Sequence, residues 1–178
     1  MNTLRTDLLF CMLFILITYI VTLIAQVNPP ADPVKPPGQL VASIAWPAGA
    51  IDVDLWLSAP GDEAVAYTRK SGKIWSLLRD DLGTANDSTS LNLEFASTRG
   101  LPDGEYAVNV RCYGCAGKVP VPVDAEIRLA EDGGLVWRGT VTLVRDKDEK
   151  TAIRFRVHAG KVVPGSQSHV FKKMREGV

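Results

Sequence analysis

No residue between Leu8 and Val27 carries a formal charge, and this stretch constrains the chain more than any other feature. A helix of this length, rising about 1.5 Å per residue, spans about 30 Å, the thickness of a bilayer's hydrocarbon core. A secretory signal peptide has a shorter apolar region and a small-residue cleavage site, whereas Leu23 and Ala25 make a poor small-x-small pair. We therefore expect an uncleaved transmembrane helix within residues 1–27.

The charges that flank this helix predict its orientation. The amino terminus and Arg5 lie on one side, and Asn28 and several prolines follow on the other. The positive-inside rule then places the N-terminus in the cytoplasm. We expect a single-pass protein of the bacterial inner membrane whose remaining residues are periplasmic.

The polar residues of the predicted helix share one narrow face. With Asp7 at zero and about 100° per residue, Thr18, Cys11 and Thr22 fall at about 20°, 40° and 60°. The polar groups on such a face would find hydrogen-bond partners inside an assembly, on a protein surface or along a thin water path. Alternatively, the threonines bond to their own backbone, Cys11 is an inert apolar residue, and Asp7 lies at the headgroups or caps the helix.

The run Arg5-Thr6-Asp7-Leu8-Leu9-Phe10, followed by an apolar stretch and Asn28-Pro29-Pro30, resembles the ExbD, TolR and MotB family of ion-driven motors. The resemblance covers only these residues. It implies a homodimer inside a ring of five multi-span subunits of the ExbB, TolQ or MotA kind. It also implies that Asp7 carries the ion and that Cys11, Thr18 and Thr22 face the pore.

Downstream, prolines at 29, 30, 33, 36 and 37 indicate an extended spacer over residues 28–39. Short alternating runs separated by turn signals then predict an all-β sandwich or jelly roll over residues 40–165, followed by a basic tail over 166–178. Turns are expected at residues 59–62, 101–104 and 131–134. The expected strands are Leu40–Trp46, Ile51–Leu57, Ala64–Thr68, Ser90–Phe95, Glu105–Cys112, Val121–Leu129, Leu135–Val144 and Thr151–Val157.

Alternation within these runs also predicts the core. The inward positions are Val53, Leu55 and Leu57, then Tyr106, Val108 and Val110, then Ile153, Phe155 and Val157. Ile74–Leu78 is expected to be a short helix or apolar turn that plugs the sandwich, with Trp75 in the core. The segments 52–57 and 101–110 look like bacterial extracytoplasmic β-sandwich modules of the pre-peptidase type, which supports the fold more than any activity.

Composition argues against several functions. Twenty basic and twenty acidic residues give no net charge, so no field favours nucleic acid. Only two histidines are present, and the common catalytic and nucleotide-binding motifs are missing from the sequence. We expect neither an enzyme nor a cofactor.

Acidic residues raise the question of a calcium site. Asp52, Asp54 and Trp56 are assigned to the outward face of one strand, and the next long connection holds Asp80, Asp81, Asp87 and Glu94. Carboxylate oxygens suit Ca²⁺, but the spacing matches no EF-hand, so no metal site is predicted.

Cys112 and Cys115 end a predicted strand, where a redox CxxC motif would open a helix. A local disulfide is expected, and a four-cysteine zinc site across a dimer axis is the alternative. The sequence thus predicts an ion-driven motor subunit that passes motion to an unidentified periplasmic partner. A static membrane-tethered module that binds a glycan, a peptide or calcium is the competing hypothesis.

Overall fold

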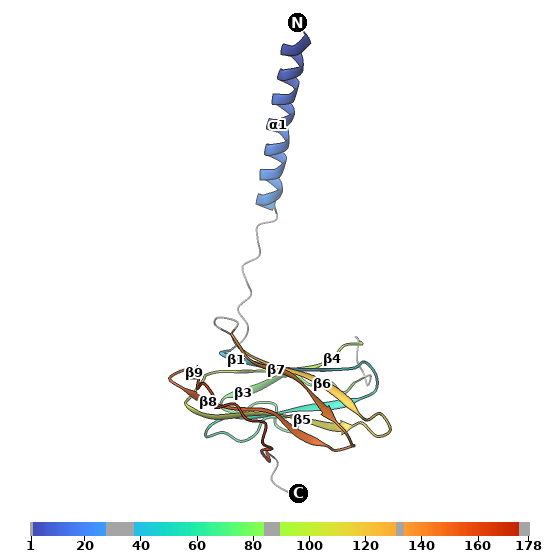
Figure 1. The fold of residues 1–178 in the computed structure, drawn as a ribbon, viewed down its shortest axis with the longest axis vertical. Coiled ribbons are helices and arrows are strands. Elements are labelled where there is room, and N and C mark those ends of the chain that lie inside the picture. The colour runs from blue at the N-terminus through green and yellow to red at the C-terminus, as the bar shows by residue number, and fades with distance from the viewer. Residues whose placement is uncertain (1, 28–37, 84–89, 131–133, 175–178) are drawn as a thin grey trace. The chain divides into compact units, whose positions relative to one another are not determined.

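A computed structural model describes residues 2–27, 38–83, 90–130 and 134–174 (Figure 1). It confirms the predicted fold class, an N-terminal apolar helix followed by an all-β sandwich. The chain divides into two compact units that separate after Val34, and each is described by itself. Most of the predicted spacer, the turn at 131–133 and Asp87 lie outside the described residues.

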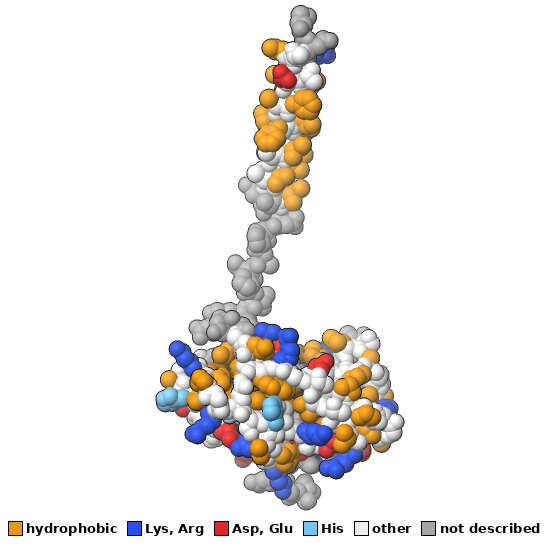
Figure 2. All heavy atoms as spheres, viewed as in Figure 1, with side chains coloured by type: hydrophobic (Ala, Val, Ile, Leu, Met, Phe, Trp, Pro, Cys, Tyr) orange, Lys and Arg blue, Asp and Glu red, His pale blue; other side chains and the backbone are white. Residues whose placement is uncertain are grey.

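Helix α1 runs from Asn2 to Val27 without interruption. Its segment Thr3–Ile24 has a mean hydropathy of 2.5 and is long and apolar enough to cross a membrane. The side chains described between Thr3 and Ile24 are all exposed, and apolar side chains are distributed along the visible face of the helix in Figure 2. Within its own unit, the helix therefore leaves these apolar side chains exposed.

The β-domain consists of two stacked antiparallel sheets. Sheet A, in spatial order, contains β3 (Trp75–Arg79), β4 (Asn92–Thr98), β1 (Leu40–Trp46), β6 (Val121–Leu129) and β7 (Leu135–Leu143). Sheet B contains β2 (Asp52–Ser58), β5 (Gly104–Gly114), β8 (Glu149–His158) and the short β9 (Lys161–Val162). Strands β2 and β3 each lie at the edge of a sheet.

The predicted core is confirmed, because each of the nine inward positions is at most 3% exposed. Strand β1 adds Leu40 and Ile44 from the opposite sheet. At the centre, the ring of Tyr106 stacks on Phe155 with centroids 5.6 Å apart, and the Tyr106 hydroxyl donates to the Pro102 carbonyl at 2.9 Å. The Tyr106 ring is therefore buried in the core while its hydroxyl group keeps a hydrogen-bond partner.

Two segments differ from the sequence prediction. Ala64–Thr68 is not a strand and forms only isolated bridges, one of which pairs Val65 with Leu57 on the outer edge of β2. The expected helix or apolar turn at Ile74–Leu78 is instead strand β3, whose Trp75 and Leu77 are buried while Leu78 is exposed. Both predictions were wrong because pairing with neighbours that are distant in sequence decides the conformation of such short runs.

The outward face of β2 also differs from the prediction. Asp54 and Trp56 are only 3% and 7% exposed. The irregular segment between β2 and β3 contributes Tyr67, which meets Trp56 edge to face at 6.1 Å, and β5 contributes Arg111 beside Asp54. This face of sheet B is therefore an additional buried layer that contains charged groups.

Candidate functional site

The open edge of β2 is closed by a carboxyl group from the opposite sheet. The Leu55 N–H, at an edge strand, donates to Glu94 Oε2 at 2.7 Å. Further along the same edge, the Leu57 N–H donates to the Val65 carbonyl at 2.9 Å. Glu94 thus supplies the acceptor that a neighbouring strand would otherwise provide.

Glu94 is almost fully buried, with 1% of its surface exposed. Its second oxygen, Oε1, accepts from the Asp81 N–H at 3.3 Å. Burial nevertheless raises the pKa of Glu94 to about 10, because removal from water opposes the charged form more than the two hydrogen bonds favour it. The nearby charges of Asp54 and Asp80 add to this rise.

Asp54 approaches the same point from β2. Burial raises its pKa to about 7, and Asp52 adds to the rise, while Arg111 opposes it. The Arg111 guanidinium lies 3.8 Å from Asp54 Oδ2, which is an ion pair but too long for a hydrogen bond. Oδ2 is buried and has no hydrogen-bond partner within the part of the chain that the structure describes.

Asp80 follows directly after β3 and completes the group. Its Oδ2 is 2.8 Å from the Lys70 ammonium, while its Oδ1 is buried and has no hydrogen-bond partner among residues 38–83, 90–130 and 134–174. One carboxylate oxygen each from Asp54, Asp80 and Glu94 lie within 4.8 Å of one another. We call these three residues the acidic triad.

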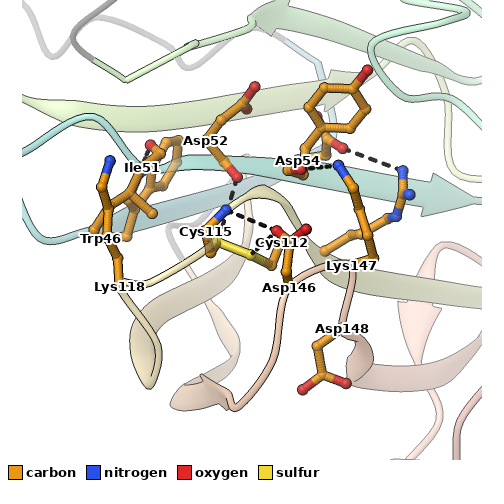
Figure 3. Close-up of a disulfide and its surroundings, with 12 residues drawn as sticks. Trp46, Ile51, Asp52, Asp54, Cys112, Cys115, Lys118, Asp146, Lys147 and Asp148 are labelled. Carbon is orange, nitrogen blue, oxygen red and sulfur yellow. Dashed lines mark hydrogen bonds and ion pairs between the residues drawn. A yellow bond between two sulfur atoms is a disulfide. The ribbon is translucent and has the colours of Figure 1, made fainter.

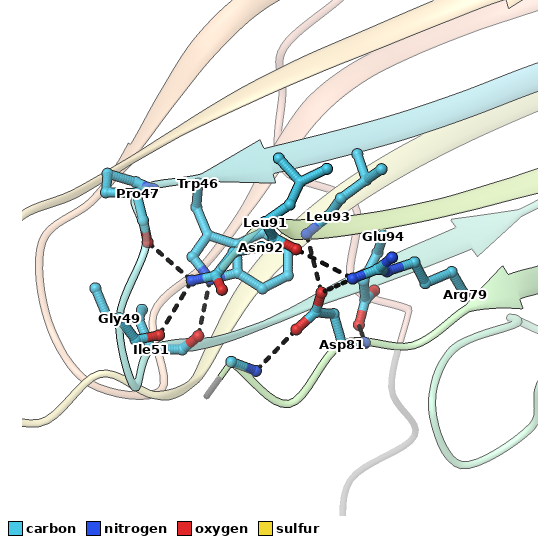
Figure 4. A network of polar contacts seen from close by, with 11 residues as sticks. Trp46, Pro47, Gly49, Ile51, Arg79, Asp81, Leu91, Asn92, Leu93 and Glu94 are labelled. Carbon is cyan, nitrogen blue, oxygen red and sulfur yellow. Dashed lines mark hydrogen bonds and ion pairs between the residues drawn. The ribbon is translucent and has the colours of Figure 1, made fainter. Parts of the chain in front are cut away.

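Neighbouring Asp81 has a different, structural role (Figure 4). Its carboxylate accepts from the Arg79 guanidinium at 2.7 Å, from the Gly83 N–H at 3.0 Å and from the Leu93 N–H at 3.2 Å. These bonds join the end of β3 to the start of β4. Asp81 therefore helps to position Asp80 and Glu94.

The structure contains the Cys112–Cys115 disulfide, with Cα atoms 5.8 Å apart and both residues fully buried. The Cys115 N–H donates to Asp146 Oδ1 at 3.0 Å, which attaches the loop after β5 to the loop before β8 (Figure 3). Asp52 lies on the neighbouring strand β2, and burial, followed by the charge of Asp80, raises its pKa. The Cys115 sulfur lies 3.7 Å from the Asp52 carbonyl oxygen, so the disulfide contacts the strand that carries Asp52 and Asp54.

The predicted membrane residues Asp7, Cys11, Thr18 and Thr22 all lie on α1, so its continuous helical geometry places them along one face. The Thr18 hydroxyl is 3.0 Å from the Phe14 carbonyl and 2.9 Å from the Ile15 carbonyl. The Thr22 hydroxyl donates to the Tyr19 carbonyl at 2.8 Å. Both hydroxyls therefore have a hydrogen-bond acceptor within their own helix.

A hollow of about 540 Å³ lies on the outer face of sheet A. Small outward residues of β1, Ser43 and Ala45, leave this space open, while Ala125 and Gly139 occupy inward positions of β6 and β7 that alternate with its polar lining. Its remaining lining is polar and includes the Thr140 hydroxyl, which donates to Asp124 at 2.6 Å, and Arg138, which pairs with Glu126. The sequence prediction did not identify this surface, although small residues at outward strand positions are its signal.

The acidic triad was also missed as a unit. Its members were noticed separately, but Asp54 was assigned to the solvent and Asp80 and Glu94 to a loop. Models of protein families, curated proteins and solved structures were compared with this chain, and none of them matches it.

Proposed function

We propose that this chain is a single-pass membrane protein in which α1 is a static anchor and the β-sandwich is an extracytoplasmic binding module. The observation that carries the proposal is the pairing of the Thr18 and Thr22 hydroxyls with their own helix. It makes the surface of most of α1 effectively apolar, which lipid can solvate without a protein partner.

The hollow on sheet A is the surface that we assign to ligand recognition. Hydroxyl, carboxylate and guanidinium groups surround it, and they suit a ligand with many hydrogen-bonding groups, such as a glycan or an extended peptide. The small outward side chains of Ser43 and Ala45 let such a ligand approach the sheet closely. Catalysis is not part of this proposal.

An ion-driven motor subunit is the second candidate, and Asp7 favours it. The carboxyl lies within the apolar helical segment Thr3–Ile24 and on the face shared by Cys11, Thr18 and Thr22. In such a motor, two copies of this chain would occupy a ring of five multi-span subunits. Asp7 would alternate between neutral and charged forms as the ion passes, a step driven by about 2.3 kcal/mol per charge for each 100 mV.

Native mass measurement after mild detergent extraction distinguishes the two functions. The anchor predicts that this chain is released without a multi-span partner, whereas the motor predicts a complex with two copies of this chain and five of the partner. Recovery of that complex would contradict the anchor.

The substitution Asp7→Asn provides a second test, because Asn keeps the size and capping ability of Asp but cannot cycle a proton. The anchor predicts equal expression, membrane insertion and ligand binding for the two proteins. In vesicles that contain the multi-span subunit, loss of proton or sodium flux in Asp7→Asn would favour the motor. Thr18→Val and Thr22→Val would then cause only partial losses.

A further inference from the structure

We propose that the acidic triad, Asp54, Asp80 and Glu94, is a binding site for a divalent cation, and that the ion is Ca²⁺. The site belongs wholly to the β-domain, at the edge where β2 meets β4 and the end of β3. It goes beyond the proposed function and holds whether α1 is a static anchor or part of a motor.

The three oxygens are close enough to share one ion. One oxygen from each residue lies within 4.8 Å of the other two. Two oxygens bound to one Ca²⁺ at about 2.4 Å can be separated by up to about 4.8 Å. Ca²⁺ accepts about six to eight oxygen ligands in flexible geometry, whereas Mg²⁺ demands near-ideal octahedral geometry, so we assign Ca²⁺ to this site.

A second observation points to a ligand, independently of the acidic composition. The Asp54 side chain is only 4% exposed, yet its Oδ2 accepts no hydrogen bond from the described residues. A buried oxygen without a donor is costly, and a cation would remove that cost. Asp80 Oδ1 is in the same position, since it too is buried without a donor in the described part of the chain.

Glu94 can bind an ion without losing its structural bonds. Each of its oxygens accepts one backbone N–H, from Leu55 or from Asp81. A carboxylate oxygen has two acceptor positions, so one position on each remains available. The edge of β2 and an ion can thus be bound by the same carboxylate.

The charges around the triad leave room for a cation. Arg111 faces Asp54 at 3.8 Å, and Lys70, whose side chain is 57% exposed, contacts only Oδ2 of Asp80. Asp52 and Asp81 face the triad as further acids, although Arg79 pairs with Asp81, and Lys147 acts on Asp52. Hard oxygen ligands without nitrogen or sulfur select Ca²⁺ over transition metals.

The test uses the full-length protein in detergent micelles, treated with a chelator and then titrated with CaCl₂. We expect saturable binding by calorimetry and a rise in Tm of about 5 to 10 °C at a hundredfold excess over the Kd. Asp80→Asn should weaken binding at least tenfold, while the matched control Glu63→Gln, an exposed acid outside the triad, should bind as wild type does.

A third variant keeps the test decisive if Asp80→Asn folds poorly. Lys70→Met leaves the triad intact and removes the ammonium that competes for Asp80, so it should bind Ca²⁺ more tightly than wild type. The site would be contradicted if no calcium binding were detected at about 10 mM CaCl₂, a concentration above the dissociation constants of weak extracellular calcium modules. Equal calcium affinity in well-folded Asp80→Asn and in wild type, or weaker calcium binding in Lys70→Met, would also contradict it. Binding of Mg²⁺ in preference to Ca²⁺ would overturn the identity of the ion.

Discussion

Asp54 and Glu94 lie in surroundings that oppose their charged forms, so each is a residue whose protonation is linked to folding. The pKa of Asp54 is raised to about 7 from 3.8, and that of Glu94 to about 10 from 4.5. The folded chain therefore holds protons at these sites that the unfolded chain has already released. Stability from a raised carboxyl pKa is present at low pH and is lost as pH rises toward the folded value.

Without metal, we predict that the free energy of unfolding falls by several kcal/mol between pH 5.5 and pH 9, at about 1.4 kcal/mol per pH unit for each of the two carboxyl groups until its folded pKa is reached. Glu105 and Asp62 have lowered pKa values, so their contributions change only in more acidic solution, below about pH 5. Urea unfolding in chelator across this range measures the effect. Asp54→Asn should reduce the pH dependence of the free energy of unfolding below about pH 7, whereas the control Glu63→Gln should leave it unchanged. A free energy of unfolding that rises from pH 5.5 to pH 9 would contradict the burial of these charges.

Among the elements, the segment after β9 is part of the sandwich rather than an extension of it. Ser168 exchanges two backbone hydrogen bonds with Arg154 of β8, at 2.8 and 2.9 Å. The Lys172 N–H donates to the Thr151 hydroxyl, and the Lys172 carbonyl accepts from the side-chain amide of Asn109, which is fully buried. The first half of the predicted basic tail thus covers the outer face of sheet B, as Tyr67 does further along that sheet.

Truncation tests the role of this segment. A chain that ends at Gly165 leaves the Asn109 amide and the Arg154 backbone without these partners, and we expect a loss of about 2 to 4 kcal/mol of stability. A chain that ends at Lys172 keeps all of these contacts and is the control. The Tm values of the two truncated chains and of wild type measure this effect. Equal Tm values for the two truncated chains would show that the contacts contribute nothing to stability.

In the whole molecule, the apolar helix and the disulfide point to the same compartment. Helix α1 exposes its apolar side chains within its own unit, and the Cys112–Cys115 bond is of a kind that persists in oxidising compartments. Both features support the proposal that the β-domain folds outside the cytoplasm.

A topology experiment tests this arrangement. We predict that a reporter fused after Val178, of a type active only when exported, is active, and that the purified chain retains Met1–Val27. The same reporter fused to a chain lacking residues 1–27 should be inactive. A mature protein that starts near Gln26 would replace the anchor with a cleaved signal sequence and would also remove Asp7.

The sequence by itself determined the features that depend on local patterns. An uncharged run long enough to span a bilayer is compatible with few structures other than a membrane-spanning helix. Strict alternation of apolar and other residues, as at Val53, Leu55 and Leu57 or at Ile153, Phe155 and Val157, predicts a half-buried strand. The proximity of Cys112 and Cys115 likewise follows from their spacing.

Only the tertiary structure decided what covers the outer face of sheet B and which acids meet. Tyr67 and the segment around Lys172 bury a face of sheet B that the alternating pattern predicts to be exposed to solvent. The prediction failed because alternation distinguishes the two sides of a strand but does not show what packs on each side. Asp54 and Glu94 are brought together by the contact between opposing sheets at the edge of β2. The acidic triad therefore depends on the packing of the two sheets, which no local pattern encodes.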